Sequence, residues 1–358
     1  MIAIIFFATI FIGLPVAFCL CFTSIVTMVL GEVSLLAFVQ NLALGMNSFP
    51  LLAVPFFILA GLLMNTGGMT HRIFNFANLL VGHIRGGLGQ VNIFASLIFA
   101  GMSGAAVADA AGLGIVEIKA MKDAGYDSDF SVAITAASST IGPIIPPSIV
   151  MVIYGITAEV SIGRLFVGGV IPGIIMTLAL VGLTYFIATK RNYPVDPWPG
   201  FQKIFKGFLN TFPALITPLI IVGGILAGVF TPTESGAIAV LYALMLGLFF
   251  YKELKLRDLP GIFVKTMLTT SMILFIIGSA KAFGWVLTYY SIPAIFAEYV
   301  GSLTKNPLLI TLLFVGVYMV LGCFMETAAI LIMTIPVVLP LTNSIGIDPI
   351  FFGVLVCI

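Results

Sequence analysis

The residues from Ser138 to Ser148 have the composition of an ion-binding break in a membrane helix. They read Ser-Ser-Thr-Ile-Gly-Pro-Ile-Ile-Pro-Pro-Ser, in the middle of Phe130–Ala158, a stretch without charge. A helix cannot run through these prolines, because proline lacks a backbone donor and clashes with the preceding turn. The freed carbonyl oxygens can hold a cation such as sodium, and helix N-termini beside the break favour a carboxylate. A packing kink that neighbouring helices satisfy is the alternative interpretation.

Two isolated carboxyl groups, Asp109 and Glu326, could take part in the same chemistry. Asp109 is the only charged residue between Arg85 and Glu117, and Glu326 is similarly isolated in its own apolar run. Charged side chains inside a membrane are costly and are therefore candidates for function. We expect each carboxylate either to support an ion or substrate site or to anchor the structure through hydrogen bonds.

Other polar residues have plainer interpretations. Glu234 follows Thr-Pro-Thr and is expected to pair with the start of a helix. Lys281 could attract an anion, or its long side chain could extend to the membrane interface. His71 and His83 lie in a polar arm, where we expect solvated side chains.

The composition predicts a membrane protein. The 358 residues are 61% hydrophobic and 8% charged, with a mean hydropathy of +1.22, whereas soluble domains contain about 25% charged residues. The runs without charge are near or above the roughly 20 residues that a membrane-spanning helix needs. They cover residues 1–31, 33–70, 86–108, 130–158, 165–189, 207–233 and 306–325. We therefore predict an all-α polytopic membrane protein with roughly 10 hydrophobic segments, some of them broken.

The sequence also excludes several classes of function. A net charge of +1 gives no sign of a nucleic-acid partner. The motifs Gly-x-Ser-x-Gly, His-Glu-x-x-His and the Walker loop are absent, so we predict that the chain is not an enzyme. Without an ATPase motif, any pumping must use an ion gradient.

Residues 91–118 predict a re-entrant hairpin. Two short apolar pieces, Val91–Met102 and Ala105–Ile118, are joined by Ser103-Gly104, and neither piece alone makes a comfortable membrane span. Backbone that leaves the helical conformation at membrane depth is tolerated only where protein or water covers it. The hairpin tip is therefore expected to lie against other parts of the chain.

An internal repeat is predicted at one constant offset along the chain, which places Gly101 on Gly322 and Asp127 on Asp348. In each half a broken apolar hairpin is followed by a turn with Gly-x-Asp and then by an apolar span that begins with phenylalanine. Transporters are often built from two inverted repeats, with the site where broken helices meet at the membrane midplane.

The repeat gives a predicted domain organisation. Residues 1–163 form the first structural repeat, with the hairpin at about 88–120 and the broken helix at about 130–158. Residues 164–206 are a linking helix and a basic loop, and residues 207–358 are the second repeat. At the same offset the second repeat stops before its own Gly-Pro-Pro break, so we expect it to be incomplete at its C-terminus.

Four segments resemble the large membrane subunit of TRAP (tripartite ATP-independent periplasmic) transporters, the DctM-like family. They are FPLLAVPFFILAG at 49–61, FAGMSGAAVADAA at 99–111, STIGPIIPPS at 139–148 and TPTESGA at 231–237. The similarity runs over essentially the whole chain. The chain departs from the family in two ways. Ala105 stands where the family usually has the second serine of Ser-Gly-Ser, and the family continues into a second Pro-Pro break.

The resemblance implies a sodium-coupled secondary transporter in the bacterial cell inner membrane, importing an organic acid anion of the C4-dicarboxylate, sialic acid or 2-oxo acid type. It implies an inverted-repeat elevator-type fold with two re-entrant helical hairpins and discontinuous helices. The implied partners are a small four-helix membrane subunit (DctQ-like) and a periplasmic substrate-binding protein. A stand-alone ion-coupled carboxylate carrier is one alternative, and a non-transporting membrane scaffold or membrane enzyme is another.

Together with the resemblance, the motifs predict three sets of site residues. The anion is expected at Ser103, Gly104, Asp109, Ser148 and Glu326. The first sodium ion is expected at Ser103, Ala106, Ser139, Thr140, Gly142, Ile145 and Pro147. A second, incomplete sodium site is expected at Gly322 and Thr327. Sodium is the expected coupling ion, and no other cofactor is predicted.

Overall fold

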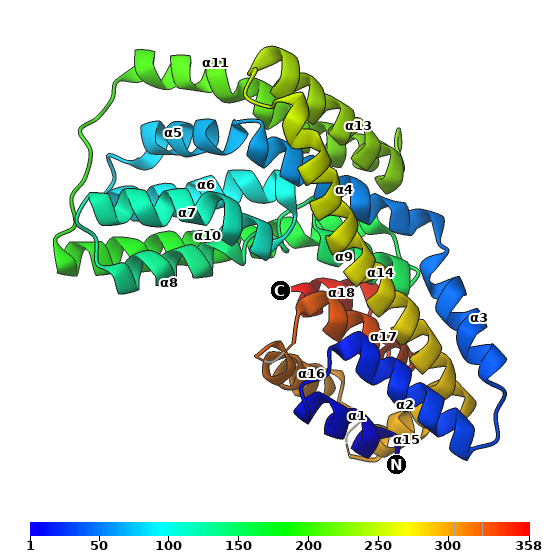
Figure 1. The fold of residues 1–358 in the computed structure, drawn as a ribbon. Coiled ribbons are helices and arrows are strands. Elements are labelled where there is room, and N and C mark those ends of the chain that lie inside the picture. Colours follow the sequence, from blue (N-terminus) through cyan, green and yellow to red (C-terminus); the bar gives the residue numbers. More distant parts are fainter. Residues whose placement is uncertain (304–305, 324) are drawn as a thin grey trace. The chain divides into compact units, whose positions relative to one another are not determined.

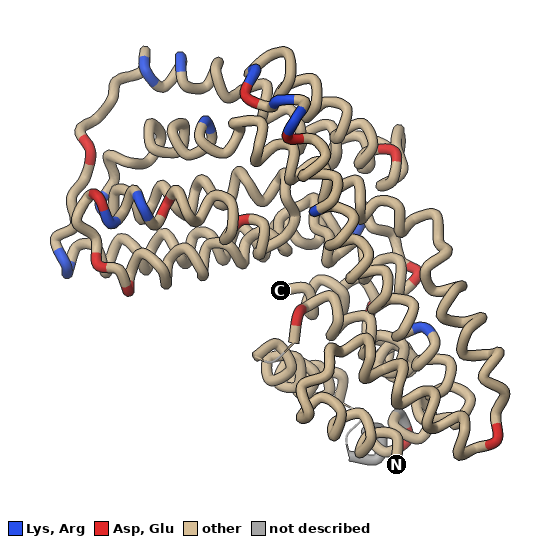
Figure 2. Tube along the Cα trace, in the orientation of Figure 1, with Lys and Arg blue, Asp and Glu red and all other residues tan. Residues whose placement is uncertain are grey.

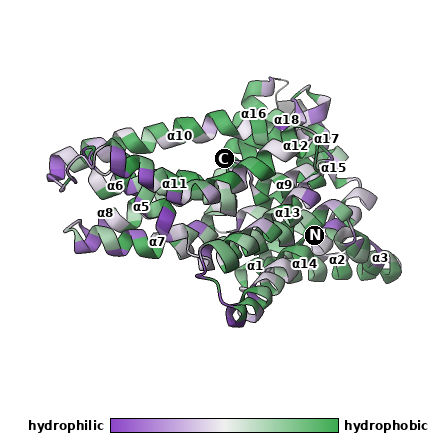
Figure 3. Cartoon of the chain, turned by 90° about the horizontal axis from the view of Figure 1, so that it is seen from above, coloured by the Kyte–Doolittle hydropathy of each residue, from purple (hydrophilic) through white to green (hydrophobic). Residues whose placement is uncertain are grey.

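The computed structural model describes residues 1–303, 306–323 and 325–358. These residues are built from helices and turns and contain no β-strand, which confirms the predicted all-α class. Six helical stretches are long and apolar enough to cross a membrane, and Figure 3 shows that such helices are largely hydrophobic along their length. They are Phe49–Thr66, Ile162–Arg191, Phe201–Leu226, Pro232–Phe250, Leu256–Tyr289 and Thr327–Ser344. The chain is a multi-pass membrane protein by the length and composition of its helices.

The helices form two compact units. The central unit comprises Ala53–Val152 and Ile162–Thr266, and the terminal unit comprises Met1–Leu52, Ile153–Ser161 and Met267–Cys357. Each unit takes helices from both halves of the chain, so the units do not coincide with the predicted repeats. The two divisions differ because a repeat is a similarity along the sequence, whereas a compact unit reflects which helices pack together.

The central unit contains the predicted hairpin and the broken helix. Its main helices are α4 (Ala53–Thr66), α5 (Met69–Val81), α6 (Gly87–Ser103), α7 (Ala106–Asp123), α8 (Ser128–Ser139), the first part of α9 (Ile149–Thr157), α10 (Ile162–Arg191), α11 (Phe201–Pro218) and α13 (Pro232–Met245). Its shorter elements are η2 (Leu219–Gly223), α12 (Gly224–Leu226), η3 (Leu246–Phe250) and η4 (Leu256–Asp258). α5, α6, α7, α8, α10 and α11 run alongside one another, as Figure 1 shows. α6 and α7 are the arms of the hairpin, and α8 and α9 flank the break.

The core of the central unit joins the hairpin to the helices around it. Ile93 and Ala100 of α6, Met121 of α7 and Ile134 of α8 pack in one cluster with Ile141 of the break. In a membrane the lipid is as apolar as these side chains, so close packing rather than removal from water holds helices together. The cluster therefore fixes the two arms of the hairpin against α8 through shape complementarity.

The terminal unit holds the two ends of the chain. It contains α1 (Ile2–Phe11), α2 (Val16–Leu30), α3 (Leu35–Met46), η1 (Phe49–Leu52), most of α14 (Leu259–Tyr289), α15 (Ile292–Leu303), α16 (Pro307–Gly322), α17 (Thr327–Ser344) and α18 (Pro349–Cys357). α3 crosses α14 closely, because a Cβ on Gly45 would lie only 3.0 Å from the Cα of Gly278. Small residues allow such close approach of membrane helices.

The helix bounds recur at the predicted offset. The offset that places Gly101 on Gly322 also places both ends of α7 on the ends of α17, and the start of α8 on the start of α18. Helix ends depend on local capping and turn residues, so this agreement adds to the few identities between the halves. Residue 207, the predicted start of the second repeat, lies inside α11, since that helix already begins at Phe201. The inverted orientation of the repeats stays a prediction.

Charged residues gather toward the ends of the helices of the central unit, as Figure 2 shows. At one end, the Tyr193 hydroxyl donates a hydrogen bond to Asp127 (2.6 Å), and Arg191 lies 2.7 Å from the same carboxylate. The Tyr193 hydrogen bond, followed by that of Arg191, lowers the pKa of Asp127. This cluster connects the turn between α7 and α8 to the end of α10. Because it is exposed to solvent, it contributes little to stability.

Tyr126 ties the base of the hairpin to the chain that follows α10. Its hydroxyl lies 3.0 Å from the carbonyl oxygens of both Gly86 and Pro194, and accepts a hydrogen bond from the Leu88 N–H (3.2 Å). Its ring stacks on Tyr193, with the centroids 4.3 Å apart. Burial raises the pKa of Tyr126 to about 12, so its hydroxyl keeps its proton and can donate. One side chain thus joins three segments that are distant in sequence.

Replacing Tyr126→Phe should therefore destabilise the central unit. The change keeps the ring but leaves the Leu88 N–H without its acceptor and the Pro194 carbonyl oxygen without the hydroxyl, which costs about 1–3 kcal/mol. We expect a lower thermal unfolding midpoint of the purified protein in detergent.

Tyr185→Phe is the matched control, because Tyr185 lies on α10 with about half of its surface exposed (49%). This variant should unfold at the wild-type temperature. Equal midpoints for Tyr126→Phe and wild type would show that the Tyr126 hydroxyl does not hold the hairpin base.

Candidate substrate and ion site

The hairpin tip is a two-residue turn between α6 and α7. Ser103 ends α6, and Gly104 follows in the left-handed region with a φ of 61°. Ala105 is extended and occupies the N-cap of α7, where its methyl group cannot cap the helix. The first N–H groups of α7 consequently lack a side-chain partner at the cap, and they carry the partial positive charge of a helix N-terminus.

The chain leaves the helical conformation between α8 and α9. α8 ends at Ser139, and a series of turns leads through the three prolines to α9. Ser148 closes this break at its far end, because its hydroxyl donates to the Pro143 carbonyl oxygen and accepts from the Met151 N–H (3.1 Å). Ser148 thus acts as the cap of α9, which begins at the end of the break.

The hairpin tip lies directly against the break. The Ile149 N–H donates to the Gly104 carbonyl oxygen at 3.2 Å. A Cβ added to Gly104 would overlap the Pro147 carbonyl oxygen, and one added to Gly142 would lie 3.2 Å from the Ala105 carbonyl carbon. The two non-helical segments that the sequence singled out are therefore in backbone contact within the central unit.

Two buried polar groups beside this contact have no hydrogen-bond partner. Ser103 is 3% exposed and Asp109 is 1% exposed, and neither the serine hydroxyl nor either carboxylate oxygen is bonded. Ser96 and Ser139 lie next to Asp109. Their hydrogens are already donated, to the Ser138 hydroxyl (3.2 Å) and the Thr135 carbonyl oxygen (2.7 Å) respectively. Buried polar groups are normally bonded, so the unpaired oxygens indicate a place for a ligand.

A network of polar side chains between α6 and α8 lies next to these unpaired groups. Asn92 of α6 donates to the Thr135 hydroxyl (2.7 Å) and accepts from Ser138 (2.6 Å), both on α8. All three side chains are almost fully buried. They fix α6 to α8 by hydrogen bonds inside the helix bundle, where such bonds are shielded from water.

The structure places the predicted residues of the first sodium site unevenly. Gly142 and Pro147 are buried at the contact with the tip, and Ile145 is half-buried against the apolar core. The Thr140 side chain is exposed, and its hydroxyl donates to the Ala137 carbonyl oxygen at 2.6 Å. Ala106 is half-buried in the first turn of α7. Any contribution of these residues to ion binding would come mainly from backbone oxygens.

Gly322 and Thr327, predicted for the second sodium site, belong to the terminal unit, as does Glu326, which was predicted for the anion. α16 ends at Gly322, and α17 begins at Thr327 after the N-cap residue Glu326, whose side chain makes no cap hydrogen bond. All three residues are exposed, and no atom would lie within 4 Å of a Cβ on Gly322. Among the described residues, these three are therefore not enclosed by ligand groups as the first set is.

Sequence reasoning missed two central residues, Glu117 and Asn92. Both are fully buried in the hairpin, with exposures of 1% and 0%. A signal was present for Glu117, because positions eight residues apart share a helix face and Glu117 follows Asp109 at that spacing.

The prediction for Glu234 is confirmed. Its carboxylate accepts from the N–H of Thr231 (2.8 Å), and the Thr231 hydroxyl accepts from the Glu234 N–H, which together form a capping box at the start of α13.

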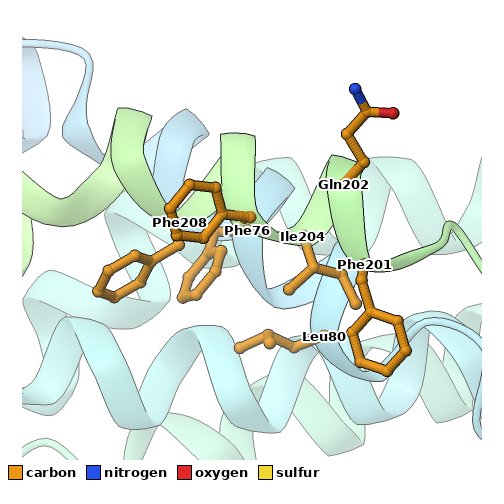
Figure 4. Close-up of a pocket in the computed structure, with 7 residues that line it drawn as sticks. Phe76, Leu80, Phe201, Gln202, Ile204 and Phe208 are labelled. Atoms are coloured by element: carbon orange, nitrogen blue, oxygen red, sulfur yellow. The ribbon is translucent and has the colours of Figure 1, made fainter.

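An apolar groove lies between α5 and α11, away from the hairpin tip. It is lined by Phe76, Leu80, Phe201, Gln202, Ile204, Phe205 and Phe208. Figure 4 shows that the Gln202 amide points away from the apolar side chains. The groove offers no charge or aligned donors, so it is unsuited to an organic anion.

Comparison with known proteins shows the family of the chain. The sequence model of the family described as "Tripartite ATP-independent periplasmic transporter, DctM component" matches residues 3–358. The chain is 45% identical to the sialic acid TRAP transporter large permease protein of Vibrio cholerae, over 96% of this chain and 81% of that protein. It is 37% identical to the 2,3-diketo-L-gulonate TRAP transporter large permease protein of Escherichia coli, over 96% and 81% respectively.

A third relative is the C4-dicarboxylate TRAP transporter large permease protein of Pseudomonas aeruginosa. It is 36% identical over 92% of this chain and 79% of that protein. All three relatives are permeases, which agrees with the prediction that this chain is not an enzyme.

Gly104→Ala tests the contact between the tip and the break. A methyl group there would meet the Pro147 carbonyl oxygen, and the left-handed backbone would cost roughly 1–2 kcal/mol more for alanine than for glycine. We expect a clear drop in the thermal unfolding midpoint.

Gly182→Ala serves as its control. A Cβ at Gly182, inside α10, would meet no atom within 4 Å, and alanine favours a helix interior by roughly 0.8–1.0 kcal/mol over glycine. This variant should be as stable as wild type or slightly more so. If both variants were equally stable, the tip would not depend on glycine.

Proposed function

Since the chain belongs to the DctM family of TRAP transporter large permeases, we propose that it imports an organic acid anion together with sodium. It is a multi-pass protein of the bacterial inner membrane. In this proposal a periplasmic substrate-binding protein delivers the anion, and a small four-helix membrane subunit completes the permease. The hairpin and the break then bind the two solutes side by side.

The observation that carries the proposal is the buried, unpaired Asp109 behind the contact of the tip with the break. A carboxylate without partners in a dry interior is unfavourable, unless a cation or proton compensates it. Sodium is suited to this place because it binds oxygen atoms, and the Ser103 hydroxyl and the backbone around Gly142 supply them nearby. The bound cation would make the site less negative before the anion arrives.

The anion is proposed to bind at the start of α7, because the N–H groups of a helix N-terminus attract carboxylates. At the start of α9, the Ile149 and Met151 N–H groups already donate to the Gly104 carbonyl oxygen and the Ser148 hydroxyl. The Gly104 N–H is not available, because it donates to the Ala100 carbonyl oxygen at 3.2 Å. The relatives described above are named for sialic acid, diketogulonate and C4-dicarboxylates, all of which are organic acids. Sialic acid is therefore the first substrate to test.

We further propose that transport follows an elevator movement, in which the helices that hold the site slide past a static scaffold. Broken helices suit this mechanism, because their non-helical segments can hold the solutes while the helices around them move as a body. The second sodium site at Gly322 and Thr327 remains part of the proposal. No described residue supports it beyond the break between α16 and α17.

Uptake into liposomes tests the function. The permease would be purified with its small membrane subunit, reconstituted, and supplied with its binding protein and radiolabelled sialic acid, diketogulonate or succinate. We expect accumulation of one of these acids only with an inward sodium gradient. Equal accumulation with a potassium gradient would overturn sodium coupling, and no uptake of any acid would overturn the substrate class.

Asp109→Asn should weaken the sodium dependence of that uptake. Loss of a residue that supports a metal site typically lowers affinity about 10- to 100-fold, so half-maximal uptake should need correspondingly more sodium. Asp123→Asn, which changes an exposed carboxylate at the end of the same helix, should leave the sodium dependence unchanged. An unaltered sodium dependence in Asp109→Asn would remove Asp109 from the site.

A further inference from the structure

A second carboxyl group lies deep in the hairpin, outside the site described above. Glu117 is 1% exposed, and neither of its carboxyl oxygens has a hydrogen-bond partner. It follows Asp109 on α7 by eight residues, which corresponds to about 12 Å along the helix axis at 1.5 Å per residue. The tip and the break lie beside Asp109, at the start of α7, so Glu117 does not touch the proposed sodium site.

The polar groups on the neighbouring helices are already used. Gly114, one turn before Glu117, lies against α8, because a Cβ there would be 2.7 Å from the Thr135 methyl group. The Thr135 hydroxyl donates to the Ser131 carbonyl oxygen (2.8 Å) and accepts from Asn92. The Ser131 hydroxyl donates to the Asp127 carbonyl oxygen (2.8 Å). Neither of these two hydroxyl groups has a hydrogen left for Glu117.

Nor does a positive charge compensate it. α7 packs against α4, α5, α6 and α8, and α4 and α6 carry no charged residue. On α5, Arg72 pairs with Glu253 at 2.6 Å and His71 is exposed. On α8, Asp129 pairs with Arg191. On α7 itself, the charged residues Lys119, Lys122 and Asp123 are all exposed.

The charge that acts on Glu117 is of the same sign. Asp109 is the other buried acidic residue of α7, and its ionised form carries a charge of the same sign. Two like charges on one helix each disfavour the ionised form of the other. With both groups ionised, the interior of the hairpin would hold two uncompensated negative charges.

We propose that Glu117 is a proton-binding site of the hairpin, separate from the place where the sodium ion and the anion are held. A metal ion would need several oxygen ligands, and the hydroxyl and amide groups around Glu117 are bonded to one another. No cluster of three acidic, histidine or cysteine side chains exists among the residues that the structure describes. A proton needs only one carboxyl oxygen. It removes the charge and turns the group into a donor.

Infrared spectroscopy tests the proton directly, without reference to transport. The full chain with its small membrane subunit, in lipid at neutral pH, should show the carbonyl stretch of a protonated carboxyl group, which shifts on exchange into D₂O. Glu117→Gln should lose this band, whereas Glu298→Gln, a change at an exposed position on α15, should keep it. Absence of the band in wild type, or its full persistence in Glu117→Gln, would overturn the proposal.

A second variant covers failure of Glu117→Gln to fold. Glu117→Asp keeps a carboxyl group at the position and should move the band, since aspartic and glutamic acids differ in the frequency of this stretch. An unmoved band would assign it to another residue and overturn the proposal.

A pH titration of the same infrared band tests the electrostatic effect of Asp109 on Glu117. In Asp109→Asn the like charge is gone, so Glu117 should bind its proton more weakly, and its band should be half lost at a lower pH than in wild type. A titration that does not move would show that the two carboxyl groups act independently.

Discussion

The arrangement of the central unit depends on one requirement. Backbone that is not helical inside a membrane must find its hydrogen bonds within the protein, because lipid offers none. The tip and the break satisfy part of this need for each other, through the bond from the Ile149 N–H to the Gly104 carbonyl oxygen. The bond requires the two backbones to approach so closely that no side chain fits at Gly104. The contact that closes the hairpin is therefore also the place beside which oxygen atoms are left for a ligand.

The polar side chains divide into those that hold the hairpin and those left for ligands. Asn92 donates to the Thr135 hydroxyl and accepts from the Ser138 hydroxyl, and these two bonds fasten α6 to α8. Asp109 and Glu117 take no part in this network and remain unpaired. A membrane interior tolerates such groups only when they are compensated. In the proposed mechanism, this separation would allow a sodium ion or a proton to bind and leave without breaking the bonds that hold the helices.

The sequence predicts the local features of this unit well and the long-range ones poorly. The break at Gly142 and the turn at Gly104 follow from glycine and proline, whose backbone preferences act within a few residues. The role of Tyr126 depends on the carbonyl oxygens of Gly86 and Pro194, which only the folded chain brings together. The sequence likewise did not predict the division into two compact units. Which helices pack is decided by side-chain shape across the bundle, and the pattern of charge along the chain does not record it.

The second half of the chain shows which part of the hairpin the fold requires. α17 has the bounds of α7 moved by the offset of the repeat, yet Ile330 and Val338 stand at the positions that correspond to Asp109 and Glu117. Likewise, Leu313 of α16 corresponds to Asn92. Helices of similar length and spacing thus form with apolar side chains at all three positions. The carboxyl groups are not needed to build helices of this length and spacing, which agrees with the proposals that Asp109 supports a sodium ion and Glu117 binds a proton.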